Sequence, residues 1–284
     1  MAEVTMETIK ELRALTNAGM MDCKKALVET NGNMEEAIKV LRKKGQAIQV
    51  KRADKEAKEG LVATAKCACG AVSLVEVNCE TDFVAKTDGF KTFVAKVAEK
   101  VAGGDVDVAA TMQTDLSALV ASTGEKMGIT RTERYVLQGT GRIESYIHMG
   151  GKIGVLVEVG CTKAETAEAP AFAEFVRDVA LQIAALAPRW LDETQIPEDI
   201  VASEKALYLQ QIEADPKNAN KPEKIKEGIV MGKFRKFAAE NCLVDQEFVK
   251  ISKTSIKQHA ANVGKALGDT LTIRRYVRFQ LGQH

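Results

Sequence analysis

Several features that mark other classes of protein are missing from this 284-residue sequence. Its 40 Lys and Arg nearly balance its 39 Asp and Glu, so a net charge of +1 supplies no overall field that would attract nucleic acid or a membrane. No apolar run is long enough to span a bilayer. The first residues lack both the apolar core of a secretory signal and the Arg-rich bias of a transit peptide. We therefore expect a cytoplasmic protein with no direct contact to nucleic acid and none to a membrane.

Residues for catalysis and metal binding are also scarce. There are three histidines, and neither a glycine-rich phosphate loop nor a Gly-x-Ser-x-Gly motif nor a paired His-Glu helix motif occurs. Six cysteines without an export signal predict reduced thiols. Cys67 and Cys69 lie in a predicted hairpin turn, with Cys79 further on, but no histidine nearby completes a tetrahedral metal site. The sequence predicts no enzyme, no metal and no cofactor; a nucleophilic Cys23 or Cys79 is the alternative, and neither has a histidine in its local sequence.

What the sequence does contain is an internal repeat. Residues 75–79 (Val-Glu-Val-Asn-Cys) match residues 157–161 (Val-Glu-Val-Gly-Cys) 82 positions later, and residues 133–136 recur at 274–277, now 141 positions later. The second copy therefore carries an insertion of 59 residues. The helical stripe that follows the first match is repeated at the same offset: Phe90, Phe93, Val94, Val97 and Val101 correspond to Phe172, Phe175, Val176, Val179 and Ile183. This indicates two related α+β units.

Residues 81–84 (Thr-Asp-Phe-Val) lie between the second strand and the helix of the first copy. A large apolar ring at the tip of such a turn either folds back beneath a loop or is held out for a partner. The second copy has Lys-Ala-Glu-Thr at 163–166, so it is expected to fold without the aromatic residue. The repeat therefore favours Phe83 as a contact for a partner.

Residues 1–45 are predicted to form a three-helix unit. The expected N-caps are Thr5, Asp22 and Asn33 with Glu36, and Gly45 is the expected end of the third helix. The first helix is predicted to turn one side inward, formed by Met6, Ile9, Leu12 and Leu15. Met20 and Met21 fall at the first inter-helix turn. Either at least one fills the small core, or they form a flexible contact for a partner.

The rest of the chain is divided by composition. Residues 46–59 carry acidic and basic side chains at helical spacing, which predicts a solvated helical linker. The first α+β subdomain is predicted at 60–140 and the second at 141–284, with an inserted helical hairpin at about 198–238 among four of the five prolines. His148 lies at a strand end beside two glycines, where it is either a plain exposed residue or a polar contact for a partner.

Two stretches resemble the signature sequences of the translation elongation factor Ts family. Residues 16–27 (TNAGMMDCKKAL) resemble its front signature, and residues 76–86 (EVNCETDFVAK) resemble its second. Residues 145–148 with 153–156 are similar to the hairpin of the family's second unit. The resemblance covers most of the chain. It implies a ubiquitin-associated-like N-terminal domain, a core of two similar subdomains with antiparallel sheets, and an inserted coiled-coil hairpin.

The resemblance also implies a function. Members of this family are guanine-nucleotide exchange factors: they bind the GTPase elongation factor Tu in its GDP form and promote GDP release, so that GTP can load. By resemblance, an exchange motif would intrude beside the partner's nucleotide and disturb its Mg²⁺; its residues are Thr81, Asp82, Phe83 and Val84. Arg13, Met20 and Met21 would dock on the partner's G domain, and His148 would help hold a second partner domain.

The sequence departs from the family pattern in two places. Asn17 stands where the family usually has glycine, and the sequence ends at His284, so the C-terminal helix of many bacterial members is expected to be absent or reduced. The inserted hairpin is long enough to form a homodimer, as in some members. The competing hypothesis is an interaction scaffold that keeps this fold for another partner or for nucleic acid. It predicts that Phe83 tolerates substitution.

Overall fold

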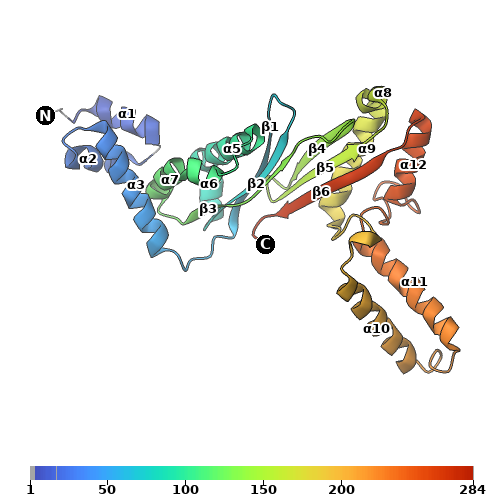
Figure 1. Cartoon of the computed structure of the whole chain (residues 1–284). Coiled ribbons are helices and arrows are strands. Elements are labelled where there is room, and N and C mark those ends of the chain that lie inside the picture. Colours follow the sequence, from blue (N-terminus) through green and yellow to red (C-terminus); the bar gives the residue numbers. More distant parts are fainter. Residues whose placement is uncertain (1–3, 17, 284) are drawn as a thin grey trace. The chain divides into compact units, whose positions relative to one another are not determined.

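The computed structural model describes residues 4–16 and 18–283 (Figure 1). Helices come first, and two three-stranded sheets with further helices follow, so the predicted α+β class is confirmed. The chain divides into two compact units. The first comprises Met1–Leu137, Ser145–Leu156 and Val277–His284; the second comprises Gln138–Glu144 and Val157–Tyr276.

The front of the first unit is helical. Its helices are α1 (Met6–Thr16), α2 (Met20–Glu29) and α3 (Met34–Lys51). The Thr5 hydroxyl accepts a hydrogen bond from the Thr8 N–H (3.2 Å), and the Asn33 side chain accepts one from the Glu36 N–H (3.1 Å). Both side chains satisfy amide groups that a helix start leaves without partners, so these two predicted caps are confirmed.

The start of the second helix and the buried face of the first helix differ from prediction. α2 begins at Met20 directly after Gly19, with no side-chain cap, so Asp22 lies in its first turn and is not its N-cap. Of the four residues of α1 predicted to face inward, Ile9 and Leu12 are buried, but Met6 and Leu15 are exposed because the buried side turns toward Thr16. That buried side consists of Ile9, Leu12 and Thr16. Asn17, between these two helices, lies outside the described residues.

The predicted helix end at Gly45 is wrong, because α3 continues to Lys51. Gly45 lies where α3 packs against α7 (Gln113–Thr123), and a Cβ atom there would overlap the Ser117 carbonyl group. Glycine is needed at this position for close approach of two helices and not for a helix end. Residues 46–51 are therefore the last turns of α3, and residues 52–58 connect it to the first strand.

The first sheet is antiparallel with the strand order β1-β2-β3. Its strands are β1 (Glu59–Lys66), β2 (Val72–Cys79) and β3 (Met127–Tyr135). Every residue of the central strand β2 is buried. Four helices follow β2 before β3: the single-turn α4 (Asp82–Ala85), α5 (Asp88–Gly103), the single-turn α6 (Val108–Thr111) and α7. α5 packs on β1 and β2 through the predicted apolar stripe, all five residues of which are buried.

The second sheet has the strand order β4-β5-β6. Its strands are β4 (Gly141–His148), β5 (Ile153–Gly160) and β6 (Thr272–Gln280). Between β5 and β6 come α8 (Ala164–Glu168), α9 (Pro170–Leu186), a 3-10 turn (Glu193–Gln195), α10 (Glu198–Ala214), α11 (Glu223–Asn241) and α12 (Ile256–Leu267). α10 and α11 form the predicted helical hairpin, and they pack on each other through contacts that bury Ile212, Val230 and Phe234.

Each middle strand carries a fully buried glutamate. Glu76 in β2 accepts a hydrogen bond from Arg131 Nε (2.8 Å), and Glu158 in β5 accepts hydrogen bonds from Arg274 Nη1 (3.1 Å) and Arg275 Nε (2.8 Å). A buried carboxylate needs a compensating charge and hydrogen bonds, which these arginines supply. The two glutamates are structural groups of the sheets.

The cysteines differ in part from prediction. Cys23, Cys79, Cys161 and Cys242 are free thiols and buried, but Cys67 and Cys69 are joined by a disulfide. The predicted hairpin turn is the physical reason, because it brings their Cα atoms to 5.2 Å. Among the described residues, no three His, Cys, Asp or Glu side chains gather as a metal site would require. No helix within residues 4–16 and 18–283 has the length and apolarity to cross a membrane.

Candidate partner-binding site

The tip that follows β2 is a single helical turn, α4 (Asp82–Ala85). The Thr81 side chain is its N-cap and accepts the Val84 N–H (3.4 Å), and the Thr87 side chain then caps α5 by accepting the Phe90 N–H (3.3 Å). Two caps within seven residues make the chain leave the strand, turn once and start a new helix. Val84 and Ala85 pack on the core of the first unit, and Phe83 does not.

Phe83 is 79% exposed. Of the nine phenylalanines, seven are buried and Phe237 is partly buried. Burying such a side chain stabilises a fold by about 1.5–3 kcal/mol, so its exposure forgoes a gain that the other phenylalanines realise. The alternative in which Phe83 folds back beneath a loop is wrong. A rigid exposed aromatic is the kind of group that anchors protein–protein contacts.

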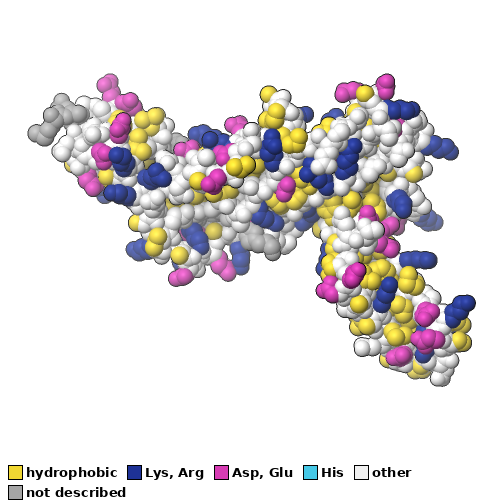
Figure 2. Space-filling model, viewed as in Figure 1, with side chains coloured by type: hydrophobic (Ala, Val, Ile, Leu, Met, Phe, Trp, Pro, Cys, Tyr) yellow, Lys and Arg dark blue, Asp and Glu magenta, His cyan; other side chains and the backbone are white. Residues whose placement is uncertain are grey.

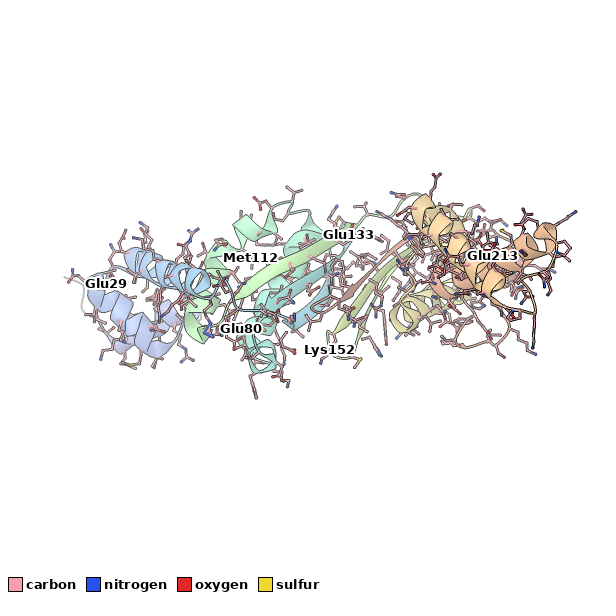
Figure 3. All side chains as sticks on the ribbon, turned by 90° about the horizontal axis from the view of Figure 1, so that it is seen from below. Glu29, Glu80, Met112, Glu133, Lys152 and Glu213 are labelled. Atoms are coloured by element: carbon pink, nitrogen blue, oxygen red, sulfur yellow. A yellow bond between two sulfur atoms is a disulfide. The ribbon has the colours of Figure 1, made fainter. Side chains whose placement is uncertain are left out.

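The base of the tip is held by hydrogen bonds between Glu80 and Thr81, which follow β2, and the segment between α7 and β3. Glu125 accepts hydrogen bonds from the Thr81 N–H (3.1 Å) and the Thr81 hydroxyl (2.6 Å). Glu80, labelled in Figure 3, accepts from the Lys126 N–H (2.7 Å) and from Arg52 Nε (2.7 Å). Each carboxylate accepts a hydrogen bond from a backbone N–H, and Glu80 also accepts one from a charged guanidinium. Hydrogen bonds to an ionised carboxylate are stronger than those between neutral groups. We call Glu80, Glu125 and Lys126 the tip clasp.

The tip clasp also reaches α3. Arg52 directly follows that helix, and Gln49 in its last turn makes two hydrogen bonds to the backbone of Met127, at 2.6 Å and 3.1 Å. Met127 starts β3, next to the clasp. The C-terminal end of α3 is therefore hydrogen-bonded both to Glu80 of the tip clasp, through Arg52, and to Met127 beside it, through Gln49.

Asp82 is the charged residue of the tip. Its carboxylate forms an ion pair with Lys86 one turn later at 2.5 Å, and both side chains are largely exposed. The hydrogen bond from Lys86 lowers the pKa of Asp82 below its ordinary value. An exposed pair of this kind adds little stability, because solvent screens it. Asp82 therefore stays ionised at neutral pH and is free to exchange Lys86 for another partner.

The three predicted docking residues lie on α1 and α2. Arg13 is exposed on α1, and Met21 is 64% exposed in the first turn of α2. Met20 is partly buried and packs on the small helical core with Ile9, Leu12 and Leu27. The core alternative is therefore realised by Met20, and a contact between Met21 and a partner stays a prediction. Met20 joins the core, while Met21 is open to solvent.

Helices α1 and α2 and the tip belong to the same unit, and α1 approaches the tip through α5. A cleft of ≈ 70 Å³ lies between the last turn of α1 and the first turns of α5, lined by Ala14, Leu15, Gly89, Thr92 and Phe93 among others. α5 begins three residues after α4 ends. The end of α1 is thus adjacent to the helix that directly follows the tip.

His148 is exposed at the end of β4, where the Tyr146 hydroxyl lies 2.9 Å from its Nδ1. The two rings are stacked with centroids 5.7 Å apart. The turn that follows is anchored to the first sheet, because the Val62 N–H donates to the Gly151 carbonyl (2.7 Å). The predicted residues therefore occupy three surfaces of the first unit: α1 with α2, α4, and the end of β4.

Sequence reasoning did not find the tip clasp. The second sheet has a comparable group: Asp269 accepts hydrogen bonds from the Thr162 N–H (3.1 Å) and the Lys163 N–H (3.0 Å), and the Thr162 hydroxyl holds the pKa of Asp269 well below its usual range. Glu125 and Asp269 lie at different offsets from the strands that follow them, so a search at a fixed offset misses them.

Over the face drawn in Figure 2, acidic and basic side chains are interspersed.

Comparison with known sequences identifies the family. The model described as elongation factor TS matches residues 80–283, which is more than half of the chain. The chain belongs to the elongation factor Ts family. Similar proteins include the elongation factor Ts of Clostridium perfringens (strain SM101 / Type A), which is 41% identical over 292 residues, covering 99% of this chain and 93% of the relative.

Two further relatives have the same description. The elongation factor Ts of Bdellovibrio bacteriovorus is 42% identical over 290 residues, covering 98% of this chain and 92% of the relative. That of Nitratidesulfovibrio vulgaris (strain DP4) is 42% identical over 282 residues, covering 99% and 96%. Because these alignments cover nearly all of the chain, membership of this translation elongation factor family extends to α1–α3 as well as to the two sheets.

Proposed function

We propose that this chain is a guanine-nucleotide exchange factor that binds the GTPase elongation factor Tu in its GDP form and promotes release of GDP in the cytoplasm. The exposed ring of Phe83 at the tip is the observation that carries the proposal. Family membership supplies the partner, and the tip supplies a group that such a partner could bury. No bond is made or broken in this process, so the protein is not an enzyme in the usual sense.

In the proposed mechanism, Phe83 is inserted between helices beside the partner's nucleotide site. Packed helices rearrange in discrete steps, so a wedge of this size can displace side chains some distance away. Mg²⁺ requires near-octahedral oxygen ligands and bridges nucleotide phosphates, so a small displacement weakens both the ion and GDP. Asp82, ionised and exposed beside Phe83, would act on the same region. Thr81 and Val84 hold the turn that presents both groups.

Exchange then follows from thermodynamic reciprocity. If this protein weakens the partner's affinity for GDP, GDP weakens the affinity for this protein by the same factor. GTP can load into the emptied site and displace the exchange factor. The exchange factor therefore acts by differential binding to two states of its partner, and it needs no cofactor of its own.

The docking role is assigned to the other two surfaces. Arg13 and Met21, with Met20 supporting them from the core, would bind the G domain of the partner, and His148 would contact a second domain. We regard α1–α3 as a ubiquitin-associated-like docking domain whose last helix extends to Lys51, beyond the boundary at residue 45. The two sheets with their buried glutamates and their clasping carboxylates would be the products of a duplication, residues 60–140 and 141–284.

The test is the release of a fluorescent GDP analogue from elongation factor Tu, followed by stopped-flow fluorescence. We expect the parent protein to accelerate GDP release. Release with Phe83→Ala should be at least about tenfold slower, which is a rise of ~1.4 kcal/mol in the activation free energy of release. Thermal unfolding should be nearly unchanged, because the ring contributes little to the core. Val106→Ala, at a fully exposed apolar side chain of the same unit, is the matched control and should exchange like the parent.

The outcomes separate the competing hypotheses. Equal acceleration by the parent and by Phe83→Ala would keep the exchange function and remove the wedge. If neither protein accelerates release, the interaction-scaffold hypothesis replaces exchange. A scaffold would also bind its partner with the same affinity in the presence and absence of GDP.

A further inference from the structure

We propose that Cys67 and Cys69 form a redox-active dithiol–disulfide pair that exchanges with low-molecular-weight thiols and disulfides of the glutathione type. Both residues lie in the turn between β1 and β2, and their sulfur atoms are bonded to each other. The turn is at the other end of β2 from the tip that carries Phe83. The proposal is therefore independent of the exchange function.

The fold does not depend on this disulfide. It closes a loop of three residues, and the entropy gained by closing so short a loop is small. Backbone bonds define the turn: the Cys67 N–H donates to the Ala71 carbonyl (2.9 Å), and the Gly70 N–H donates to the Cys67 carbonyl (3.0 Å). Behind the turn, β1 and β2 are paired from Lys66 opposite Val72 to Glu59 opposite Cys79.

The second sheet supports the same conclusion. Its turn between β4 and β5 carries Met149 and Gly151 at the positions that correspond to Cys67 and Cys69 by the 82-residue offset. This second hairpin forms without any cysteine. The cysteines are thus an addition to the first hairpin and not a requirement of the turn. A disulfide that is exposed and dispensable for folding belongs to the labile class that regulates or reacts.

The surroundings of the pair favour reaction at Cys69. Cys69 is exposed and Cys67 is partly buried. Nη2 of Arg134 lies 3.9 Å from the Cys69 sulfur, and Nε of the same guanidinium donates to the Ala102 carbonyl (3.0 Å), which holds it in place. A fixed positive charge stabilises a thiolate, the reactive form of cysteine. Cys69 is therefore the attacking thiol of the reduced pair, and Cys67 is the resolving thiol.

The four other cysteines are excluded from this chemistry. All are buried, and burial raises the pKa of each thiol, to about 12 for Cys79 and for Cys242. At neutral pH they are protonated and out of reach of a reagent in solvent. Thiol chemistry in the native protein is therefore confined to one hairpin turn.

The reaction balances with one small disulfide. On oxidation, the Cys69 thiolate attacks a disulfide RSSR, forms a Cys69–SR mixed disulfide and releases RS⁻. The Cys67 thiolate then attacks the Cys69 sulfur and releases the second RS⁻, and the two RS⁻ ions take up the two protons that the Cys67 and Cys69 thiols gave up. The sum is dithiol plus RSSR giving the protein disulfide plus two RSH. Reduction by two RSH follows the same steps in reverse, with the Cys69 thiolate leaving beside Arg134.

The test equilibrates the native protein in buffers with different ratios of reduced to oxidised glutathione, traps thiols with iodoacetamide, and counts labels by mass spectrometry of peptides. We expect the label on Cys67 and Cys69 to rise and fall reversibly with the ratio while the other four cysteines stay unlabelled. Cys67→Ser should stop at a stable Cys69–glutathione mixed disulfide, and Cys69→Ser should form much less of the corresponding Cys67–glutathione mixed disulfide. A pair that never oxidises even in oxidised glutathione alone would overturn the proposal.

Two further measurements separate reaction from structure. Alkylation of Cys69 in the reduced protein should slow by about fivefold in Arg134→Gln, because a unit charge near 4 Å is lost, and it should be largely retained in Arg134→Lys. The oxidised and reduced forms should unfold at nearly the same temperature. A large loss of thermal stability on reduction would identify a structural disulfide, and an unchanged alkylation rate in Arg134→Gln would remove Arg134 from the site.

Discussion

Phe83 and Gly45 show how the neighbours of a residue decide its role. Phe90, Phe93, Phe172 and Phe175 are buried at the core positions that their spacing predicts, while Phe83, on the turn between a strand and a helix, remains 79% exposed. Gly45 lies inside α3, where glycine ordinarily weakens a helix by about 0.5–1 kcal/mol relative to alanine. Both residues sacrifice local stability. Gly45 does so for the packing of α7, and we propose that Phe83 does so for a partner.

We predict that Gly45→Ala lowers the free energy of unfolding by about 1–3 kcal/mol, because the new Cβ meets the Ser117 carbonyl, a backbone group that cannot rotate away. The gain in helix propensity is too small to offset this overlap. Gly228→Ala is the matched control, since a Cβ in the middle of α11 meets nothing within 4 Å. It should stabilise its helix by about 0.5–1 kcal/mol. Urea denaturation followed by circular dichroism measures both, and an undisturbed Gly45→Ala would contradict the tight crossing.

At the scale of elements, α4 is too short to hold itself. Ordering one helical turn costs conformational entropy that its two i→i−4 hydrogen bonds, from the Ala85 and Lys86 N–H groups, do not repay, so its geometry has to be fixed from outside. The tip clasp supplies it through Glu125 at Thr81 and through Glu80 with Lys126 and Arg52. The orientation of Phe83 is therefore set by α3 and by the segment before β3. α4 alone does not determine it.

We predict that Glu125→Ala slows GDP release from elongation factor Tu by about tenfold, although Glu125 itself is a positioning residue behind the tip. Amide hydrogen exchange should become faster at residues 81–86 and stay unchanged in α5. Glu125→Gln should recover part of the rate, because its amide oxygen can still accept the Thr81 N–H. Glu99→Ala, at an exposed position on α5, is the control. Normal GDP release by Glu125→Ala would show that the partner, and not the clasp, orients the tip.

At the scale of the whole molecule, the α10–α11 hairpin is set apart from both sheets in sequence and carries apolar side chains on its surface. Leu207, Ile225 and Met231 are each between 43% and 49% exposed. Figure 2 shows apolar side chains along this hairpin among charged ones. A surface of this kind suits self-association, and the homodimer that the length of the hairpin allows stays a prediction.

We predict that sedimentation equilibrium gives a dimer at micromolar concentration and that Leu207→Glu combined with Ile225→Glu gives a monomer. Two buried like charges at a two-fold interface would cost more than the apolar contacts they replace. Lys221→Glu, in the loop that joins α10 and α11, is the control for a change of charge alone. A parent protein that is monomeric at every concentration would exclude dimerisation through the hairpin.

The sequence by itself determined the strands and most of the longer helices, whereas α4 was expected only as part of a turn. Alternation and 3.6-residue spacing located the strands, α5, α9 and the hairpin helices, because one apolar face per element is enough to specify it. The second copy of the unit lacks the aromatic residue, and that difference between the copies singled out Phe83. The turn that carries Cys67 and Cys69 also followed from the sequence.

Only the tertiary structure decided how those elements meet. The extension of α3 past Gly45, the exposure of Met6 and Leu15, the partition of Met20 and Met21, and the disulfide in the first hairpin all depend on neighbours distant in sequence or on the exact turn. The tip clasp is the clearest case, because Glu125 lies 44 residues after Thr81. Local pattern carries no information on such pairs: they form when two surfaces pack, and burial then selects the hydrogen bonds.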